Sequence, residues 1–150
     1  MRLKVSSILA VLLATSCGDY PRDPEGTLKR VQGEKSFRVG LVAPLGEAGD
    51  GSEAARLLQA ISVRTGAEPR IVRGDAEPLL NRLEEGDLDL VIGRFEKKSP
   101  WARLVTIGPP LRREMHKKVE FHLAPVMMNG ENAWIGLVER EARNVAPEAQ

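Results

Sequence analysis

Three short apolar segments, separated by two amphipathic ones, constrain the fold of this chain more than any other feature. The apolar segments FRVGLV, PRIVR and LDLVIG cover residues 37–42, 69–73 and 88–93. Between them, residues 53–65 and the leucine-rich stretch after Asp75 carry apolar side chains at helical spacing. Strands that alternate with helices in this way are joined by right-handed crossovers and lie parallel. We therefore predict an α/β fold in which a mainly parallel sheet has helices on both faces.

The second half of the chain continues this pattern less regularly. Residues 102–107 (ARLVTI) predict a fourth strand, which the following GPP ends. Residues 111–118 (LRREMHKK) are polar and are expected to be exposed. Residues 119–128 predict an extended segment with a bend or a sheet edge at Pro125, because proline donates no ladder hydrogen bond. An amphipathic helix over 131–143 closes the domain.

The first residues have the composition of an export signal. Arg2 and Lys4 precede the apolar stretch VSSILAVLLA, which is too short to span a bilayer as a permanent helix. The segment LLATSC then places Cys17 where cleavage is expected, and it resembles a bacterial lipobox. We predict a lipoprotein signal over 1–16 with lipid attached to Cys17. Ordinary cleavage near this point and an uncleaved apolar start are the alternatives.

Residues 17–35 are predicted to be a tether. The stretch from residue 18 carries two prolines, three glycines and many charges, with one helical turn around 27–32, so the folded domain is expected to cover 36–145. The net charge of +1, which becomes −1 without Arg2 and Lys4, disfavours a nucleic-acid binder. A single cysteine allows no internal disulfide, so packing alone must stabilise the domain.

No segment predicts a catalytic centre, a metal site or a cofactor site. His116 and His122 lack neighbouring ligand residues, and the glycine-rich loop APLGEAGDGS lacks the endings of known nucleotide-binding loops. Backbone N–H groups at 51–53 would suit a small anion, unless a residue of the loop caps the helix and occupies these donors. From Arg94 to Lys118, eight basic residues accompany two acidic ones. This excess favours anionic ligands or lipid headgroups, unless the segment is a solvated pair of loops.

A series of segments in fixed order carries a further signal. These segments are GTLKRVQGEKSFRVGLV, FRVGLVAPLG, PLLNRLEEGDLDLVIGRF and SPWARLVTIGPPL, within residues 26–111. Together they resemble the first lobe of bacterial extracellular solute-binding proteins of family 3. The later segment FHLAPVMMNGENAWIGLVEREA resembles the return of the chain into that lobe as a strand and a final helix. The resemblance implies a single lobe of a periplasmic-binding-protein-like fold.

The resemblance also implies where a ligand would lie. Proteins of this family bind amino acids and similar solutes between two lobes, and the loops after the first and third strands contact the ligand. Ligands of open parallel sheets lie beyond the carboxyl ends of the strands, in agreement with this placement. In amino-acid-binding members an arginine clamps the ligand carboxylate, a role open here to Arg103 or Arg94. The implied site residues are Ala43, Pro44, Leu45, Arg94, Phe95, Ser99 and Arg103.

One departure from the family concerns length. Family members continue through a second lobe after the segment that GPP resembles, whereas here a short segment returns the chain to the first lobe. Half of the usual cleft is therefore absent, and a partner or a second copy in a homodimer would be needed to complete it.

The resulting expectation is an exported, periplasmic, lipid-anchored protein that is not an enzyme. It would bind a small polar or anionic solute such as an amino acid, as an accessory to ABC transport or sensing, with an ABC permease or envelope protein as partner. The alternative is an envelope interaction lipoprotein that keeps only the fold.

Overall fold

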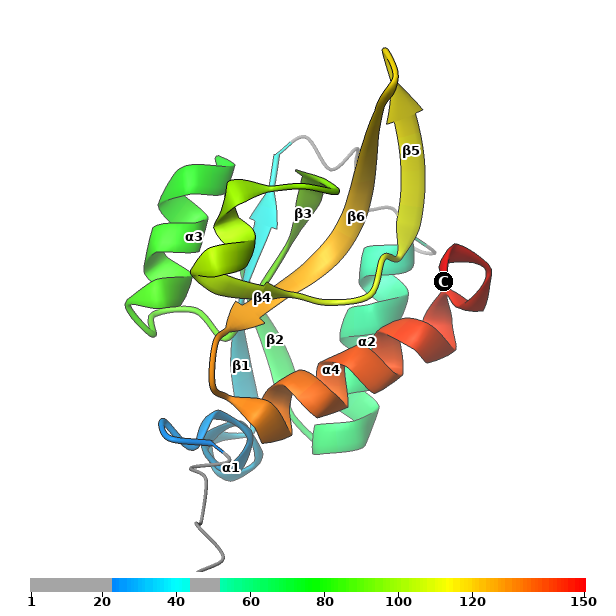
Figure 1. The fold of residues 1–150 in the computed structure, drawn as a ribbon. Helices are drawn as coiled ribbons and strands as arrows, with labels where there is room; N and C mark the ends of the chain where they lie inside the picture. Colours follow the sequence, from blue (N-terminus) through cyan, green and yellow to red (C-terminus); the bar gives the residue numbers. More distant parts are fainter. Residues whose placement is uncertain (1–22, 44–51) are drawn as a thin grey trace, which may run out of the picture.

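A six-stranded sheet with helices on both faces is formed by the residues that the computed structural model describes, 23–43 and 52–150 (Figure 1). Its parallel part consists of β1 (Ser36–Val42), β2 (Glu68–Gly74) and β3 (Leu90–Glu96). The connecting helices are α2 (Glu53–Thr65) and α3 (Ala76–Glu84). The predicted order of strands and helices in the first half is confirmed.

The second half of the chain completes the sheet through one reversed strand. Strand β6 (Val119–Met128) lies antiparallel between β3 and β4 (Val105–Ile107), and β5 (Arg112–His116) pairs with the first half of β6. The order across the sheet is β2-β1-β3-β6-β4. Because β4 and β5 both oppose β6, all strands except β6 run in one direction. The predicted α/β class with a mostly parallel sheet is confirmed.

Two predictions for residues 102–118 need correction. The fourth strand is shorter than 102–107, because Pro100–Arg103 form the 3-10 helix η1 before β4 begins. Residues 112–116 were expected only to be polar and exposed, yet they form β5. Sequence patterns of apolar alternation do not detect this strand, because its residues are polar on both faces.

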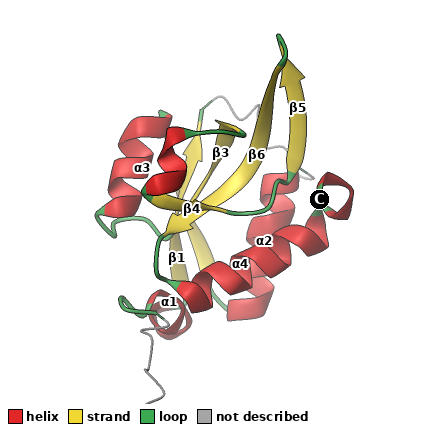
Figure 2. Cartoon of the chain, in the orientation of Figure 1, coloured by secondary structure: helices red, strands yellow, loops and turns green. Residues whose placement is uncertain are grey.

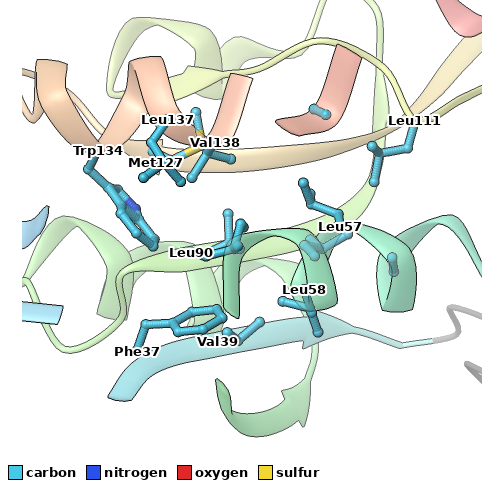
Figure 3. Close-up of a cluster of buried hydrophobic side chains, with 14 of the residues drawn as sticks. Phe37, Val39, Leu57, Leu58, Leu90, Leu111, Met127, Trp134, Leu137 and Val138 are labelled. Carbon is cyan, nitrogen blue, oxygen red and sulfur yellow. The ribbon is translucent and has the colours of Figure 1, made fainter. Parts of the chain in front are cut away.

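The larger core lies between the sheet and the helices α2 and α4 (Asn132–Val145) (Figure 3). Trp134 of α4 is fully buried, and its ring meets Phe37 edge-on with 5.9 Å between the ring centroids. The Trp134 indole N–H donates a 2.7 Å hydrogen bond to the backbone carbonyl of Asp89. A buried indole needs such a partner, so this bond fixes α4 against the start of β3.

The smaller core lies between the sheet and α3 on the opposite face, as the separation of the helices in Figure 2 shows. Strand β3 contributes to both cores: Leu90 and Ile92 belong to the larger one, whereas Val91 and Phe95 belong to the smaller one. This arrangement explains the continuous apolar run in the sequence, since a strand covered on both faces has no polar side to alternate with.

Helix α1 (Thr27–Glu34) corrects the predicted domain boundary. Residues up to 35 were assigned to a tether, but Val31 of α1 is fully buried in the larger core. The carboxylate of Glu131 accepts hydrogen bonds from the backbone N–H groups of Glu25 (2.8 Å) and Thr27 (3.0 Å). These contacts satisfy donors at the start of α1 that a helix leaves unpaired. The folded domain therefore includes α1.

The chain ends in the short 3-10 helix η2 (Pro147–Ala149), where Ala149 is buried against the larger core. In the described part of the chain, no helix is long and apolar enough to cross a membrane. The predicted signal segment and Cys17 lie outside the described residues.

Candidate functional site

The carboxyl edge of the sheet brings together the ends of β1, β3 and the hairpin made by β5 and β6. Strand β1 leaves its pairing with β3 at Leu41 and Ile92, so Ala43 and Arg94 follow at the same edge. Ala43 is exposed, and its N–H donates to the carbonyl of Gly74 at 2.9 Å. Pro44 and Leu45, predicted to contact a ligand, lie outside the described residues.

Helix α2 begins at this edge with a side-chain cap. The Ser52 hydroxyl accepts the N–H of Ala55 at 3.2 Å, which is the usual way in which serine satisfies a free donor of the first turn. The first N–H of the predicted anion site, at Gly51, lies outside the described residues. Ser52 therefore caps the helix, and the anion-binding prediction stays a prediction.

Arg94 belongs to an ion-pair cluster on the α2 side of the sheet. Its Nε lies 2.9 Å from Oε2 of Glu114 on β5, and its guanidinium carbon lies 4.1 Å from the ring centroid of Phe121 on β6. Glu114 also pairs with Arg112, which in turn lies 3.6 Å from Glu53 at the start of α2. The four charged side chains sum to zero, and we call them, together with Phe121, the edge cluster.

The edge cluster remains accessible to solvent. The side chains of Arg94 and Glu114 are 42% and 33% exposed, so water screens their attraction. The Arg94 guanidinium therefore forms a cation–π interaction with the ring and a charge-assisted hydrogen bond with the carboxylate. The cluster thus presents positive and negative groups in alternation. A polar ligand can replace the ion-pair partner of any of these groups with a charged group of its own.

Phe95 does not join Arg94 at the open edge. Its ring is only 6% exposed and packs in the smaller core under α3. Gly93 makes this possible, because a Cβ at residue 93 would lie 2.7 Å from the Val42 side chain and 2.8 Å from the Phe95 ring. The motif Gly93-Arg94-Phe95 therefore directs the cation outward and the aromatic ring inward.

Ser99 and Arg103 flank η1 rather than the edge cluster. The N–H of Ser99 donates to the carbonyl of Glu96 at 2.9 Å, and Arg103 is exposed at the end of η1. Helix η1 packs through Trp101 against the smaller core on the α3 side. Among the described contacts, no ion pair or side-chain hydrogen bond joins Arg103 to Glu114 or Glu53 of the edge cluster. The structure brings Ala43 and Arg94 to one edge and leaves Ser99 and Arg103 apart from the edge cluster.

The sequence analysis missed Arg112, Glu114 and Phe121. Arg112 and Glu114 were interpreted as part of an exposed polar segment, because three adjacent charged residues give no alternation that would indicate a strand. Strand pairing places Glu114 opposite Phe121 and Arg112 opposite Leu123, so all their side chains share the face of Arg94.

The histidines have structural surroundings. His122 Nε2 lies 2.8 Å from Oε1 of Glu120, and Lys97 pairs with the other oxygen of that carboxylate at 2.9 Å. Hydrogen bonds from His122 and Lys97 lower the pKa of Glu120 to about 2. His116 is exposed at the end of β5. Within residues 23–43 and 52–150, no cluster of three or more metal-ligating side chains is present.

A wide groove of about 640 Å³ lies elsewhere, on the outer surface between α2 and α4. Its lining includes Arg56, Val63, Arg64 and Glu141, none of which belongs to the carboxyl edge. Arg64 and Glu141 pair across the groove at 3.1 Å, so it is mainly a seam between two packed helices. Its size alone does not outweigh the topological argument for the sheet edge.

Comparison with protein-family models and with curated proteins finds no match for this sequence. Solved structures do share the fold. The arginine-bound form of domain 1 from TmArgBP, of T. maritima, has a TM-score of 0.64 at 15% identity over 77% of this chain and 97% of that one. The arginine-bound substrate-binding protein AbpA from Streptococcus pneumoniae has a TM-score of 0.65 at 9% identity, over 80% of this chain and 92% of that one. An ancestral cationic amino acid solute-binding protein, AncCDT-1, also has a TM-score of 0.65, at 10% identity over 81% and 94% of the two chains.

These similarities define the class of fold, which is a single lobe of a periplasmic-binding-protein-like domain, as predicted. AbpA is a substrate-binding protein and AncCDT-1 is a solute-binding protein. At such low identity the likeness concerns the fold alone.

Proposed function

We propose that this chain is an exported solute-binding protein of one lobe, which binds a small polar solute such as an amino acid at the carboxyl edge of its sheet. The observation that carries the proposal is the edge cluster, in which accessible charges of both signs surround an aromatic ring. A zwitterionic amino acid offers a carboxylate to Arg94 or Arg112 and an ammonium group to Glu114. The fold likeness supports this placement, since ligands of such sheets lie beyond the strand ends.

A single lobe is compatible with binding. The neighbour solved as domain 1 alone is arginine-bound, and this chain aligns with 97% of it. In the present domain the outgoing strand β5 and the returning strand β6 are joined directly through Lys117 and Lys118, the point where the family resemblance implies a second lobe. A ligand on one lobe keeps much of its surface in water, so we expect weak affinity unless a second copy or a partner covers it.

The export assignment rests on the N-terminal segment. A lipid on Cys17 would hold the domain at the periplasmic side of an envelope membrane, as an accessory to ABC transport or sensing. Incorporation of radiolabelled palmitate, lost on substitution of Cys17→Ser, tests the anchor. Absence of incorporation in a lipoprotein-processing host would leave only the solute-binding part of the proposal.

A thermal-shift screen tests solute binding. A ligand that binds only the folded state at about 100 times its dissociation constant stabilises it by about 2.7 kcal/mol. We expect arginine, other amino acids or small dicarboxylates to raise the melting temperature, and Arg94→Ala to abolish the response. Arg140→Ala on the exposed side of α4 is the matched control. An unchanged response in Arg94→Ala would remove Arg94 from the site, and no response to any solute would reject the proposal.

The second candidate is an envelope interaction protein that keeps only the fold. One observation favours it: Arg94 already has a carboxylate partner in Glu114, so its charge is neutralised without a ligand. The screen separates the two candidates, because this second function predicts no solute response from the monomer or from a dimer.

A further inference from the structure

The hairpin of β5 and β6 ends in a basic tip that the proposed solute site does not use. Figure 1 shows this hairpin extending beyond the rest of the sheet, at the end of the domain opposite α1. The tip carries five basic residues and two exposed apolar ones. We define the hairpin tip as Lys97, Lys98, Arg113, Met115, Lys117, Lys118 and Val119.

The charges of the hairpin tip are mostly uncompensated. Lys97 pairs with Glu120 at 2.9 Å, but none of the other four basic residues forms an ion pair within the described structure. Lys98, Lys118 and Val119 line a shallow open depression of about 310 Å³ together with Lys97, Glu96 and Glu120. Even with these two carboxylates included, the tip keeps an excess of three positive charges, which attracts anionic surfaces.

The apolar side chains lie on both faces of the tip. Met115 is 68% exposed and Val119 is 40% exposed. Strand pairing sets Met115 opposite Glu120 and Val119 opposite His116, and neighbouring pairs of a ladder point to opposite faces. A surface that contacts only one face would leave one of these two residues in water. Both become covered if the tip enters a deformable apolar layer end-on.

The backbone conformation of the turn is unfavourable for the two lysines that occupy it. Lys117 and Lys118 have φ angles of 45° and 69°, the left-handed conformation that two-residue hairpin turns require. Asn-Gly is the sequence that suits such a turn, whereas lysine is unfavourable at both positions. Two adjacent lysines therefore occur where local conformation disfavours them.

We propose that the hairpin tip docks on an anionic lipid surface, with Met115 and Val119 entering the headgroup region and the lysines contacting lipid phosphates. Binding of this kind combines buried apolar area with attraction to anionic lipids. An acidic protein is the less suitable occupant, because a partner docked on one face would leave either Met115 or Val119 in water. The proposal is independent of solute binding.

A fluorescent label at the tip tests this directly. Cys17 is the sequence's one cysteine, so full-length Cys17→Ser with Met115→Cys carries an environment-sensitive dye at a single position. We expect a blue shift with vesicles of equal parts phosphatidylglycerol and phosphatidylcholine, and none with pure phosphatidylcholine. Salt at about 0.5 M should remove most of the shift, since it screens charge over a few ångströms. The same dye at exposed Gln32→Cys on α1 reports attachment through the N-terminal segment.

The double variant Lys117→Asn/Lys118→Gly keeps the test independent of folding. It removes two charges while fitting the turn better, so it should melt at a higher temperature and still need about 30-fold more vesicles for half of the shift, at about fivefold per basic residue. Absence of a shift at residue 115, or an equal shift with neutral vesicles, would overturn the proposal. A shift that the double variant retains would do the same, and a response to polyglutamate but not to vesicles would assign the tip to an acidic protein instead.

Discussion

Two arginine–carboxylate clusters lie at opposite ends of β3 and differ in burial. At the amino end, the Asp89 side chain is 2% exposed and accepts bonds from the guanidinium groups of Arg30 and Arg38 and from the backbone N–H of Arg38. At the carboxyl end, Arg94 and Glu114 are 42% and 33% exposed; they pair with each other, Glu114 also pairs with Arg112, and Arg94 stacks on the Phe121 ring. The two clusters use the same chemistry in different dielectric surroundings.

The difference in burial indicates which cluster stabilises the domain and which one is accessible to a ligand. A carboxylate without water must receive a full set of donors, because an unpaired buried charge costs several kcal/mol. The Asp89 cluster meets this need and, through Trp134, connects α1, β1, β3 and α4. An exposed pair contributes about 0–1 kcal/mol, so its partners can be exchanged at little cost. The amino end therefore stabilises the domain, and the carboxyl end is available for binding.

Replacing Asp89 should give the largest effect. Asp89→Ala leaves two arginines near the core without their acceptor, so we expect the free energy of unfolding to fall by about 3–5 kcal/mol. Glu114→Ala is the matched variant at the other end and should cost less than about 1 kcal/mol. Urea denaturation measures both. Equal losses in the two variants would contradict the contrast between the clusters.

Gly93→Ala should come next. The added methyl would lie 2.7 Å from Val42 and 2.8 Å from the Phe95 ring, so the smaller core must shift. Such overpacking costs about 1–3 kcal/mol. Gly136→Ala in α4 is the control, because nothing lies within 4 Å of its added Cβ and alanine favours a helix. A lower melting temperature for Gly136→Ala than for Gly93→Ala would contradict the packing of the Phe95 ring beside Gly93.

The hairpin turn offers a gain in stability. Lys117→Asn/Lys118→Gly relieves two left-handed lysines, each of which costs about 1–2 kcal/mol, so a rise of roughly that size in the free energy of unfolding is expected. Denaturant titration measures it. Because neither cluster contains these residues, the solute response should stay unchanged, and its loss would extend the binding site onto the tip.

The contact between Asp23 and Glu131 should make stability depend on pH. Burial, followed by the hydrogen bond and charge of Glu131, raises the pKa of Asp23 from 3.8 to about 6. Burial opposes ionisation of Glu131 too, but hydrogen bonds from Asp23 and from two backbone N–H groups lower its pKa overall. For Asp23 the folded state binds the proton more tightly, so its contribution is present at low pH and is lost as the pH rises to about 6.

We therefore expect the free energy of unfolding to fall by about 1 kcal/mol between pH 4 and 6, since Glu131 acts in the opposite direction. Asp23→Asn should flatten this dependence and be more stable than the parent at pH 7. Glu77→Gln, at the exposed start of α3, is the control. A pH profile that Asp23→Asn leaves unchanged would assign the dependence to other groups.

Arg94→Ala should have the smallest effect on stability. The free energy of unfolding should change by less than about 1 kcal/mol, because the pair with Glu114 is screened by water. A solute response that disappears in this stable variant would place Arg94 in the binding site. A large loss of stability would instead make the carboxyl end structural, like the amino end.

Local patterns of apolar residues predicted the elements of the first half of the chain well. The runs at 37–42 and 69–73 became β1 and β2, and the helical stripe at 53–65 became α2. The third strand shifted from 88–93 to Leu90–Glu96, because pairing with β6 extends it to Glu96 while Asp89 turns its side chain to Arg30 and Arg38. Strand β5 was missed, since its residues are polar and its only support is the neighbouring β6.

The candidate site was predicted only in position. Topology placed a binding edge after β1 and β3, and Arg94 lies there. The sequence contained no indication that Phe95 would turn into the core, because that depends on the space beside Gly93 and Val42. It also did not reveal Glu114 and Phe121, which approach Arg94 through antiparallel pairing. Ser99 and Arg103 were assigned by resemblance, and η1 separates them from the edge cluster.

The sequence by itself determined the class of fold, since hydrophobic periodicity sets which faces must be buried and alternating strands and helices give parallel crossovers. Only the tertiary structure decided which charges are structural and which are available. Asp89 and Glu114 are chemically alike in the sequence, and their roles differ because one lies under Trp134 and the other at the rim. Burial is a property of the assembled domain, and it sets the cost of removing each charge.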